Sequence, residues 1–451
     1  MAKTLWSGIE HDIIDQYLND QNPRPWVIAF SGGKDSTTLL QVVWNSISTI
    51  DPEQRTRKLH VVCNNTLVEN PVIISYVKSQ LDSIRAAAVE QSMPISVEHT
   101  IPVMNNTFWV NLIGRGYVAP NSLFRWCTER LKINPTSKYI QEKVSLYGEV
   151  IILLGTRKAE SNTRSRSIKR YEVKGKRLSK HDLPGANVYA PLKDVSTNDV
   201  WWYLAQNPSP WHSDNNDLVH IYRNASDDND CPLITDKSTP ACGQSRFGCW
   251  VCTVVSSDKS MMNLISSGDN WMQPLLDFRN MLAQTINRDR IDYDPLIYRM
   301  PERRNGQEGL GPYWPRWRHK ILRQLLETQN IVQRTEPNIQ LISEQELVAI
   351  QVIWGRDFIT DYTVTEAYNE VYGTRIESLN FLESKNKENE ILKSVCVTNP
   401  SDADLITNLL NAQKSKILLV NKRGLRKEIE YLIEEHIEPT KSHAYRKDNN
   451  K

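Results

Sequence analysis

A strand-like segment that runs into a glycine pair and then into a helix constrains the fold of this chain more than any other feature. The apolar, β-prone residues 27–30 are followed by Ser31-Gly32-Gly33-Lys34-Asp35-Ser36 and then by Thr37-Thr38-Leu39-Leu40. Glycine adopts backbone angles that residues with a Cβ avoid, so the loop can turn its main-chain N–H groups toward a bound anion. The positive end of the following helix and the charge of Lys34 act at the same place. We therefore predict a phosphate-binding loop, distinct from the Walker loop because the Gly-x-x-x-x-Gly-Lys-Ser/Thr spacing is absent.

Strand-like and helix-like patterns alternate through the first half of the chain, which predicts a parallel sheet with crossover helices. The expected strands are residues 27–30, 59–64, 95–100 and 149–155, and the expected helices are 37–48, 71–91 and 135–147, with another opening at 197–199, whose side chains supply capping oxygens. Ligands bind beyond the carboxyl ends of the strands in open α/β sheets. Ser31, Asn65 and Thr156 each follow an expected strand, so we expect them to share one face.

The rest of the chain is predicted to be mainly helical. Helical patterns cover residues 261–287, 316–329 and 343–354, while 416–420 is a candidate strand and 441–451 a polar tail. A length of 451 residues predicts two or three domains: an α/β domain (1–212), a cysteine-bearing segment with its helices (213–330) and a C-terminal region (331–451). The expected fold class is α/β, with a Rossmann-like parallel sheet flanked by helices, a cysteine-rich segment and a mainly helical C-terminal region.

Composition and charge limit the cell compartment and the binding partners that we expect. No apolar run approaches the ~20 residues of a membrane span, and residues 1–20 are polar and lack a signal-peptide core, so we expect a cytoplasmic protein with no membrane partner. A net charge of +2 does not mark a general nucleic-acid binder. Positive charge is nevertheless concentrated, against two glutamates, at Arg157, Lys158, Arg164, Arg166, Lys169, Arg170, Lys174, Lys176 and Arg177. This stretch is either a solvated loop or a grip for phosphates.

Four of the seven cysteines crowd into one short segment with the spacing C-x10-C-x6-C-x2-C, at Cys231, Cys242, Cys249 and Cys252. Two thiolates three positions apart can reach one metal ion or cluster, and the nearby Gly243 and Gly248 permit the sharp turns that such a site needs. The segment therefore predicts a metal site, against the alternative of unligated buried cysteines. The spacing alone fits structural zinc and an iron–sulfur cluster equally well.

Cys127 lies in a different chemical setting. Its neighbours in sequence include Arg125, Arg130 and Lys132, and positive charge near a thiol lowers its pKa and favours the nucleophilic thiolate. Cys127 is therefore a candidate nucleophile, with a packed cysteine at a helix start as the alternative. Cys63 ends an expected strand and is interpreted as a core residue.

The loop motif supports a family resemblance. Ser-Gly-Gly-Lys-Asp-Ser is the signature of the pyrophosphatase loop, and the chain resembles the N-type ATP pyrophosphatase superfamily, whose fold is of the adenine nucleotide alpha hydrolase type. The resemblance implies cleavage of ATP between its α and β phosphates, with Asp35 placed to help with Mg²⁺ and Lys34 at the phosphates. The implied nucleotide-binding residues are Ser31, Gly32, Gly33, Lys34, Asp35, Ser36, Thr37, Gly155 and Arg157.

Further segments narrow this resemblance. Arg125-Trp126-Cys127-Thr128, followed by Leu131-Lys132, is similar to the phosphoadenosine phosphosulfate reductase branch of the superfamily. Residues 108–116, 155–161 and 245–255 resemble the sulfurtransferase of bacterial DNA phosphorothioation, an enzyme that replaces a non-bridging oxygen of the DNA backbone by sulfur. The resemblance implies DNA, a cysteine desulfurase and other phosphorothioation proteins as partners. A restriction or genome-defence role follows from the family alone.

The same resemblance assigns the remaining site residues. It implies a 4Fe-4S cluster on Cys231, Cys242, Cys249 and Cys252, with Cys127 as a possible ligand in place of Cys231. Cys127 is the candidate to carry sulfur or to hand it on. Arg157, Arg164 and Arg166 would neutralise DNA and nucleotide phosphates.

Three other functions remain open. A sulfonucleotide reductase shares the fold, although no C-terminal Glu-Cys-Gly-like motif follows Cys252. A tRNA thiolation enzyme uses the same loop but would be expected to show paired C-x-x-C motifs, and this chain has one. A zinc-bound nucleic-acid adaptor would bind DNA without turning over ATP.

Overall fold

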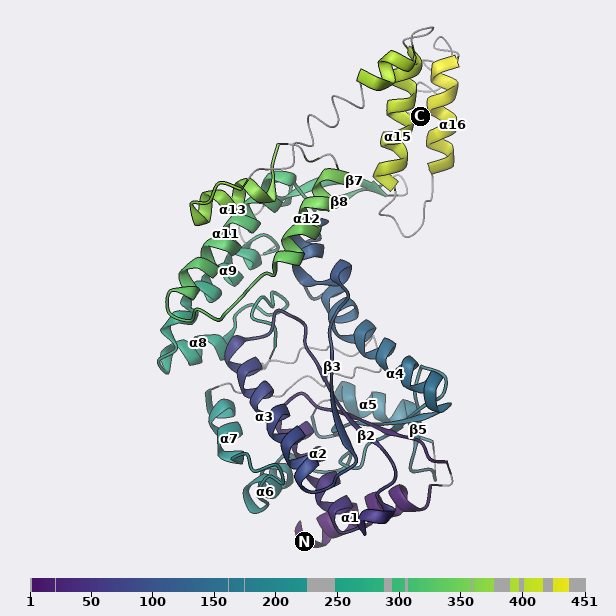
Figure 1. Ribbon diagram of the computed structural model, residues 1–451, viewed down its shortest axis with the longest axis vertical. Helices are drawn as coiled ribbons and strands as arrows, with labels where there is room; N and C mark the ends of the chain where they lie inside the picture. Colours follow the sequence, from purple (N-terminus) through teal and green to yellow (C-terminus); the bar gives the residue numbers. More distant parts are fainter. Residues whose placement is uncertain are drawn as a thin grey trace.

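The structure is a computed structural model in which an N-terminal α/β unit, a helical unit and a C-terminal helix pair follow one another from the N-terminus to the C-terminus (Figure 1). It describes residues 2–20, 22–160, 162–173, 175–224, 248–287, 294–304, 307–357, 359, 361–376, 390–396, 401–416 and 425–437. Cys231 and Cys242, the polar tail 441–451 and all but the first residue of the candidate strand 416–420 lie outside these residues.

The predicted parallel sheet is confirmed. Its six strands are β1 (Trp26–Ala29), β2 (Leu59–Asn64), β3 (Ile95–Thr100), β4 (Val150–Leu153), β5 (Ser179–Lys180) and β6 (Ala186–Tyr189), in the order β3-β2-β1-β4-β6-β5. Only the pair β5–β6 is antiparallel. Ile28 of β1 is in register with Val61 of β2 on one side and with Leu153 of β4 on the other. β5 and β6 are short and lie in a polar stretch, so no apolar run announces them.

The crossover helices also form where the pattern predicts them. They are α2 (Lys34–Ser48), α3 (Pro71–Glu90), α4 (Asn134–Tyr147) and α6 (Thr197–Gln206). The predicted cap of α6 is wrong by one position: Ser196 is the N-cap, and its hydroxyl accepts the N–H of Asp199. Ser196 has extended backbone angles, whereas Thr197 is already helical.

The helices that were not predicted include the first helix of the chain and one in the basic stretch. α1 (Ala2–Leu18) buries Trp6, Ile13 and Tyr17, whose spacing is helical even though the segment is polar overall. α5 (Asn162–Tyr171) occupies the basic stretch that was interpreted as a solvated loop or a phosphate grip. It has no apolar stripe, so hydrophobic periodicity could not reveal it.

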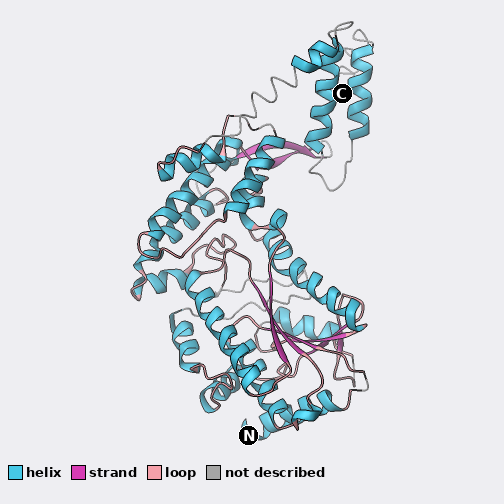
Figure 2. Ribbon diagram, in the orientation of Figure 1, coloured by secondary structure: helices cyan, strands magenta, loops and turns pink. Residues whose placement is uncertain are grey.

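Helices lie on both faces of the sheet (Figure 2). Alternating side chains of the strands pack against them. Trp26 and Ile28 of β1 enter a core shared with α1, α2, α3, α6 and α7 (Asn215–Asn224). Val27 and Ala29 enter the opposite core with Ile140 of α4. A strand buried on both faces is typical of parallel sheets, and it explains the continuous apolar run before the loop.

A second, helical core begins beyond the sheet. It is built on the π-helical segments η3 (Val110–Gly114) and η4 (Thr128–Ile133) and on α8 (Lys259–Ser266), α9 (Gln273–Gln284), α11 (Pro315–Gln333), α12 (Glu344–Arg356) and α13 (Val364–Tyr372). η4 runs directly into α4, which connects this core with the sheet. The core takes side chains from both sides of the expected boundary at residue 330, from Leu325 to Trp354. The expected division of the chain into three domains stays a prediction.

The segment 261–287 and the C-terminal part, which were expected to be helical, form several separate elements. Residues 261–287 form two helices, α8 and α9, separated by a short turn, η5 (Asn270–Met272). The charged stretch before Gly311 forms α10 (Pro295–Tyr298) and the hairpin β7 (Arg299–Arg304) and β8 (Gln307–Tyr313). α12 begins with a full capping box, Ser343 with Glu346. α15 (Ser401–Lys416) and α16 (Leu425–Ile437) pack as a pair.

Across the described ranges, no helix has the length and apolar character needed to cross a membrane.

Candidate functional site

The phosphate-binding loop lies where the strand order of the sheet reverses. β1 continues to β2 on one side, whereas β4 was added on its other side, so the loops after β1 and β4 leave the same edge in opposite directions. Such a switch point is the usual ligand crevice of open α/β sheets. Ser31, Asn65 and Thr156 follow parallel strands at this edge, as predicted.

Backbone geometry closes the loop tightly. Gly32 has φ +76°, and a Cβ there would lie 2.6 Å from Cγ2 of Val77 in α3. Ser36 accepts the N–H of Ser31 at 3.2 Å and donates to the carbonyl oxygen of Gly33 at 3.0 Å. Gly33 is the N-cap of α2 and offers no side chain to cap it. The loop is therefore pre-shaped at the positive end of a helix, where an anion is favoured.

A buried cluster of charges joins this loop to the one after β4. Arg157 Nε donates to Asp35 Oδ1 at 2.7 Å, and Lys34 Nζ lies 3.2 Å from Asp35 Oδ2. Arg157 is 0% exposed, Lys34 2% and Asp35 8%. A Cβ on Gly155 would lie 2.8 Å from the carbonyl oxygen of Asp35, so this close approach of the two loops requires glycine. Two cations thus contact the two oxygens of one buried carboxylate.

Arg157 has one further property that points to a ligand. Its Nη1 donates to the Val195 carbonyl at 3.3 Å and to Thr197 Oγ1 at 3.2 Å. Its Nη2 is buried and has no hydrogen-bond partner among the described residues. The hydroxyl of Thr37 on α2 is likewise buried without a hydrogen-bond partner among the described residues. Because an unmet buried donor costs stability, a bound anion is the partner that fits it.

Two other basic residues that the structure describes, Lys158 and Arg166, lie apart from this cluster. Lys158 forms an exposed ion pair with Asp194 at 2.8 Å. Arg166 is exposed on α5, and the side chain of Arg164 lies outside the described part. Glu160 accepts the main-chain N–H of Arg157 at 3.0 Å and so orients the turn that carries it.

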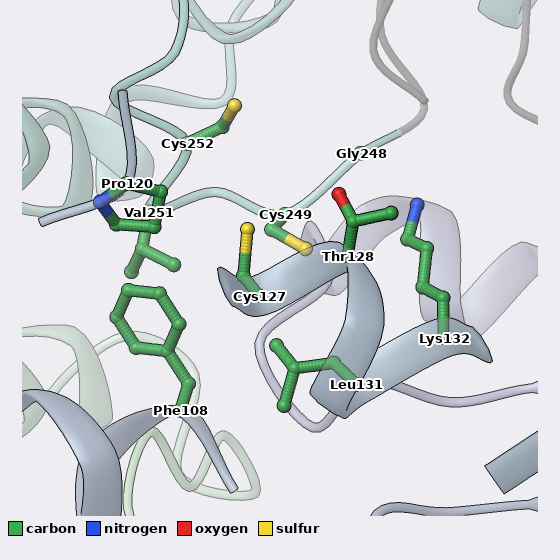
Figure 3. A pocket seen from close by; sticks show the side chains of 10 residues that line it. All are labelled: Phe108, Pro120, Cys127, Thr128, Leu131, Lys132, Gly248, Cys249, Val251 and Cys252. Carbon is green, nitrogen blue, oxygen red and sulfur yellow. The ribbon is translucent and has the colours of Figure 1, made fainter. Parts of the chain in front are cut away.

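Three of the predicted cysteines line a single pocket, which is partly open to solvent (Figure 3). Cys127 stands at the start of η4, and Cys249 and Cys252 come from the loop after residue 247. The pocket is lined by Phe108, Pro120, Cys127, Thr128, Leu131, Lys132, Gly248, Cys249, Val251 and Cys252. The structure thus brings Cys127 together with the C-x-x-C pair, which sequence spacing could not establish.

The pocket is attached to the loop that follows β2. Glu69 and Cys249 form an antiparallel bridge, and Trp250 N donates to the Val68 carbonyl at 3.0 Å. Thr66 Oγ1 lies 3.5 Å from Cys249 Sγ. The buried Arg279 of α9 donates to the carbonyl oxygens of Cys252, Val255 and Ser256. The thiol pocket is therefore attached to a loop at the carboxyl edge of the sheet, the edge at which the phosphate loop also lies.

Thiol donors suit zinc and iron–sulfur clusters. Within the described ranges, no group of three or more His, Cys, Asp or Glu side chains is arranged to hold a metal ion. In Figure 3 the sulfur of Cys252 points away from those of Cys127 and Cys249. The two other predicted ligands, Cys231 and Cys242, lie outside the described residues. The donor chemistry fits the predicted cluster, and its ligand set stays a prediction.

The positively charged residues that neighbour Cys127 in the sequence differ in where their side chains lie. Lys132 lines the pocket, whereas Arg130 is directed to Asn106 Oδ1 at 2.6 Å and to the Tyr117 hydroxyl at 3.0 Å. Burial raises the pKa of Glu69 to about 7, against the opposing effects of Lys132 and Thr66. Glu69 was missed in the sequence, where no motif marks it. Burial also raises the pKa of the Cys63 thiol, which lies in the core as interpreted.

One protein family matches more than half of the chain. Residues 25–255, just over half of the chain, match the phosphoadenosine phosphosulfate reductase domain. An uncharacterized protein of Methanocaldococcus jannaschii is 26% identical over 190 residues, which cover 42% of this chain. The match spans only 33% of that relative's own length.

Two solved structures resemble the chain weakly. A phosphoadenylyl-sulfate reductase from Candida auris, in a phosphate complex, has a TM-score of 0.28 at 14% identity, covering 45% of this chain and 81% of that one. A tRNA thiolase from Methanococcus maripaludis with its 4Fe-4S cluster has a TM-score of 0.26 at 15% identity, covering 65% and 84%. At such TM-scores neither likeness supports a conclusion about this chain.

Proposed function

Because the chain belongs to the phosphoadenosine phosphosulfate reductase domain family, a family of enzymes, we propose that it is an ATP-dependent sulfurtransferase acting on the DNA backbone. The observation that carries the proposal is a pairing of two sites. A buried cluster of charged side chains lies on the phosphate loop, and a pocket lined by three thiols is attached to the loop after β2, which leaves the same edge of the sheet. The first suits nucleotide activation, and the second suits sulfur chemistry.

Activation takes place at the phosphate loop. A non-bridging oxygen of the DNA phosphate attacks the α-phosphorus of ATP, and pyrophosphate leaves with the electron pair of the broken bond. The loop N–H groups, Lys34 and Arg157 stabilise the charge that develops on pyrophosphate, since preorganised donors act most strongly where charge appears. Asp35 is the carboxylate that the loop offers to Mg²⁺, although both of its oxygens contact cations in this structure.

Sulfur transfer follows at the activated phosphate. A sulfur nucleophile attacks the DNA phosphorus, and AMP leaves with the original oxygen. Cys127 is the residue proposed to present this sulfur, received as a persulfide from a cysteine desulfurase. Cleavage of the persulfide S–S bond takes two electrons from an external reductant. Cys249 and Cys252, with Cys231 and Cys242, would hold a 4Fe-4S cluster that supplies a site for binding or relaying sulfur.

The choice of DNA rests on sequence resemblance rather than on contacts. Three segments, 108–116, 155–161 and 245–255, resemble the DNA phosphorothioation sulfurtransferase. The first contains η3, the second joins the phosphate loop, and the third carries the C-x-x-C pair of the pocket. Exposed cations on α5, including Arg166, supply charge for a phosphate backbone. Other phosphorothioation proteins would act as partners.

A second candidate is a sulfonucleotide reductase, which the family match itself favours. In that case the loop would bind the phosphosulfate of the substrate, and no ATP would be consumed. The two activities leave different products. The sulfurtransferase releases pyrophosphate from ATP, whereas the reductase releases sulfite from phosphoadenosine phosphosulfate.

Pyrophosphate release from ATP in the presence of DNA tests the proposal. Asp35→Ala should lower the rate at least about 100-fold, because it removes the buried carboxylate that contacts both Lys34 and Arg157. Asp82→Ala is the matched control, since Asp82 forms an exposed pair with Arg85 far from the loop in sequence. An unchanged rate in Asp35→Ala would refute the loop assignment. Sulfite production without pyrophosphate release would favour the reductase.

A further inference from the structure

Tyr222 places a hydroxyl oxygen on the phosphate loop itself. The main-chain N–H of Lys34 donates to the Tyr222 hydroxyl at 3.2 Å, and Lys34 Nζ lies 5.1 Å from the centre of the Tyr222 ring. Lys34 is the first residue of α2. Its N–H belongs to the group at a helix start that has no partner within the helix and that binds phosphate oxygens in such loops. A neutral oxygen of the protein therefore holds a donor that a phosphate oxygen would use.

The helix that carries Tyr222 is held at both of its ends. Asn215, at the start of α7, accepts from Gln41 of α2 at 2.7 Å and donates to the carbonyl oxygens of Leu204 and Asn207. Near the other end, Trp201 of α6 contacts the Tyr222 ring edge-on, with the ring centres 5.1 Å apart. α6 lies beside α2, and α7 lies beside α6 (Figure 1). The first turn of α7 is thus fixed to α2, while its last turn reaches the phosphate loop through Tyr222.

We propose that Tyr222 is a competing ligand of the phosphate loop. Its hydroxyl occupies the Lys34 N–H in the nucleotide-free protein, and a phosphate oxygen of the nucleotide displaces it on binding. The inference rests on the proposed function, because it requires the loop to bind phosphates. It adds a residue that nothing in the loop motif indicates, 188 positions away in the chain.

Displacement has a consequence beyond the loop. α7 ends at Asn224, and the chain then runs through the stretch that contains Cys231 and Cys242 before it reaches Gly248 at the thiol pocket. We therefore expect that displacing Tyr222 changes the reactivity of the thiols that follow α7 in the sequence. By linkage, any nucleotide effect on those cysteines implies an equal effect of the cysteine segment on nucleotide affinity.

Titration calorimetry with inorganic pyrophosphate tests the competition. Tyr222→Phe keeps the ring that contacts Trp201 and Lys34 but removes the hydroxyl. It should bind pyrophosphate about two- to tenfold more tightly than the natural protein, the range that one hydrogen bond produces. Tyr147→Phe is the matched control, because Tyr147 lies at the end of α4 and should leave the affinity unchanged.

The possible outcomes separate this inference from the proposed function. Equal or weaker pyrophosphate binding by Tyr222→Phe would overturn it, since a tyrosine that helps to hold phosphate must lose affinity when its hydroxyl is removed. If the natural protein binds no pyrophosphate, the loop assignment fails and the inference fails with it. As a second measurement, pyrophosphate should change the alkylation rate of the cysteines at least about threefold in the natural protein. Tyr222→Phe, in which the hydroxyl contact is already absent, should show less than half of that change.

Discussion

His60 is a buried base on β2, and its environment makes the stability of the protein depend on pH. The residue is 4% exposed, and Nδ1 lies 2.8 Å from Ser96 Oγ. Burial, with Lys143 and Lys58 nearby, lowers its pKa from 6.5 to about 4. Between these two values the unfolded chain binds a proton that the folded chain does not. The contribution of this residue to the free energy of unfolding is therefore complete above about pH 6.5 and is lost as the pH falls toward 4.

Urea unfolding of His60→Gln and of the natural protein, at pH 7.5 and at pH 5, checks this prediction. Protonation of His60 on unfolding should cost the natural protein about 2 kcal/mol between these pH values, from about 1.4 kcal/mol per pH unit below 6.5. The variant lacks this term, so the difference in unfolding free energy between the two proteins should shift by that amount in favour of the variant at pH 5. Other histidines are common to both proteins and cancel. A difference independent of pH would contradict the assigned shift.

Single residues of the site were predictable when a local pattern carried them. The loop residues, Gly155 and Arg157 follow strand ends, and the sheet geometry brings them together. The grouping of Cys127 with Cys249 was foreseen only through family resemblance, because more than a hundred residues separate them. Tyr222 and Glu69 were missed, since each acts through a contact with a distant segment, and no spacing rule describes such a contact.

At the scale of elements, the connection between η3 and α11 depends on the absence of a side chain at Gly116. Gly116 has φ +71°, and a Cβ there would lie 2.7 Å from Cζ of Arg318. Arg318 is 4% exposed and donates to the carbonyl oxygens of Tyr313 and Gly114, at 3.0 and 3.1 Å. The guanidinium cannot yield without losing these bonds. Gly116→Ala therefore adds a steric conflict to the backbone strain.

Gly148 supplies a matched control, because it has φ +80° but nothing within 4 Å of an added Cβ. Gly148→Ala should cost about 1 kcal/mol of unfolding free energy, the usual strain at positive φ. Gly116→Ala should cost about 3 kcal/mol or more, since buried hydrogen bonds of Arg318 are also broken. Chemical denaturation of both variants measures the two terms. Equal losses would show that Arg318 moves aside without cost.

Elements were predictable in proportion to their apolar pattern. β2 and β3 have the predicted bounds because each is an apolar or alternating run between turn residues. α5 and the hairpin β7–β8 were missed because charged residues dominate both. The π-helical form of η3 and η4 could not be predicted, since it differs from an α-helix in hydrogen bonding and not in composition.

At the scale of the whole molecule, the two candidate sites rest on different apolar cores. Phe30, directly before the phosphate loop, packs edge-on against Trp211 in the first core, with the ring centres 6.5 Å apart. Phe108, Leu131 and Val251 of the thiol pocket belong to the second core, which also contains Trp354. Trp354 Nε1 donates to the Ile113 carbonyl at 3.0 Å and ties α12 to η3. The C-terminal part of the chain thus supports the pocket rather than the loop.

This arrangement predicts that each site can be damaged without the other. Trp354→Ala should cost about 3–5 kcal/mol of stability and speed alkylation of Cys127 and Cys249, while pyrophosphate affinity changes less than twofold. Trp211→Ala is the reciprocal variant: a similar loss of stability should weaken pyrophosphate binding and leave alkylation of the pocket thiols near its original rate. Alkylation kinetics followed by mass spectrometry, with calorimetry on the same samples, measure both properties. If each variant lost both together, the two cores would form one cooperative unit, and the C-terminal helices would then support the phosphate loop as much as the thiol pocket.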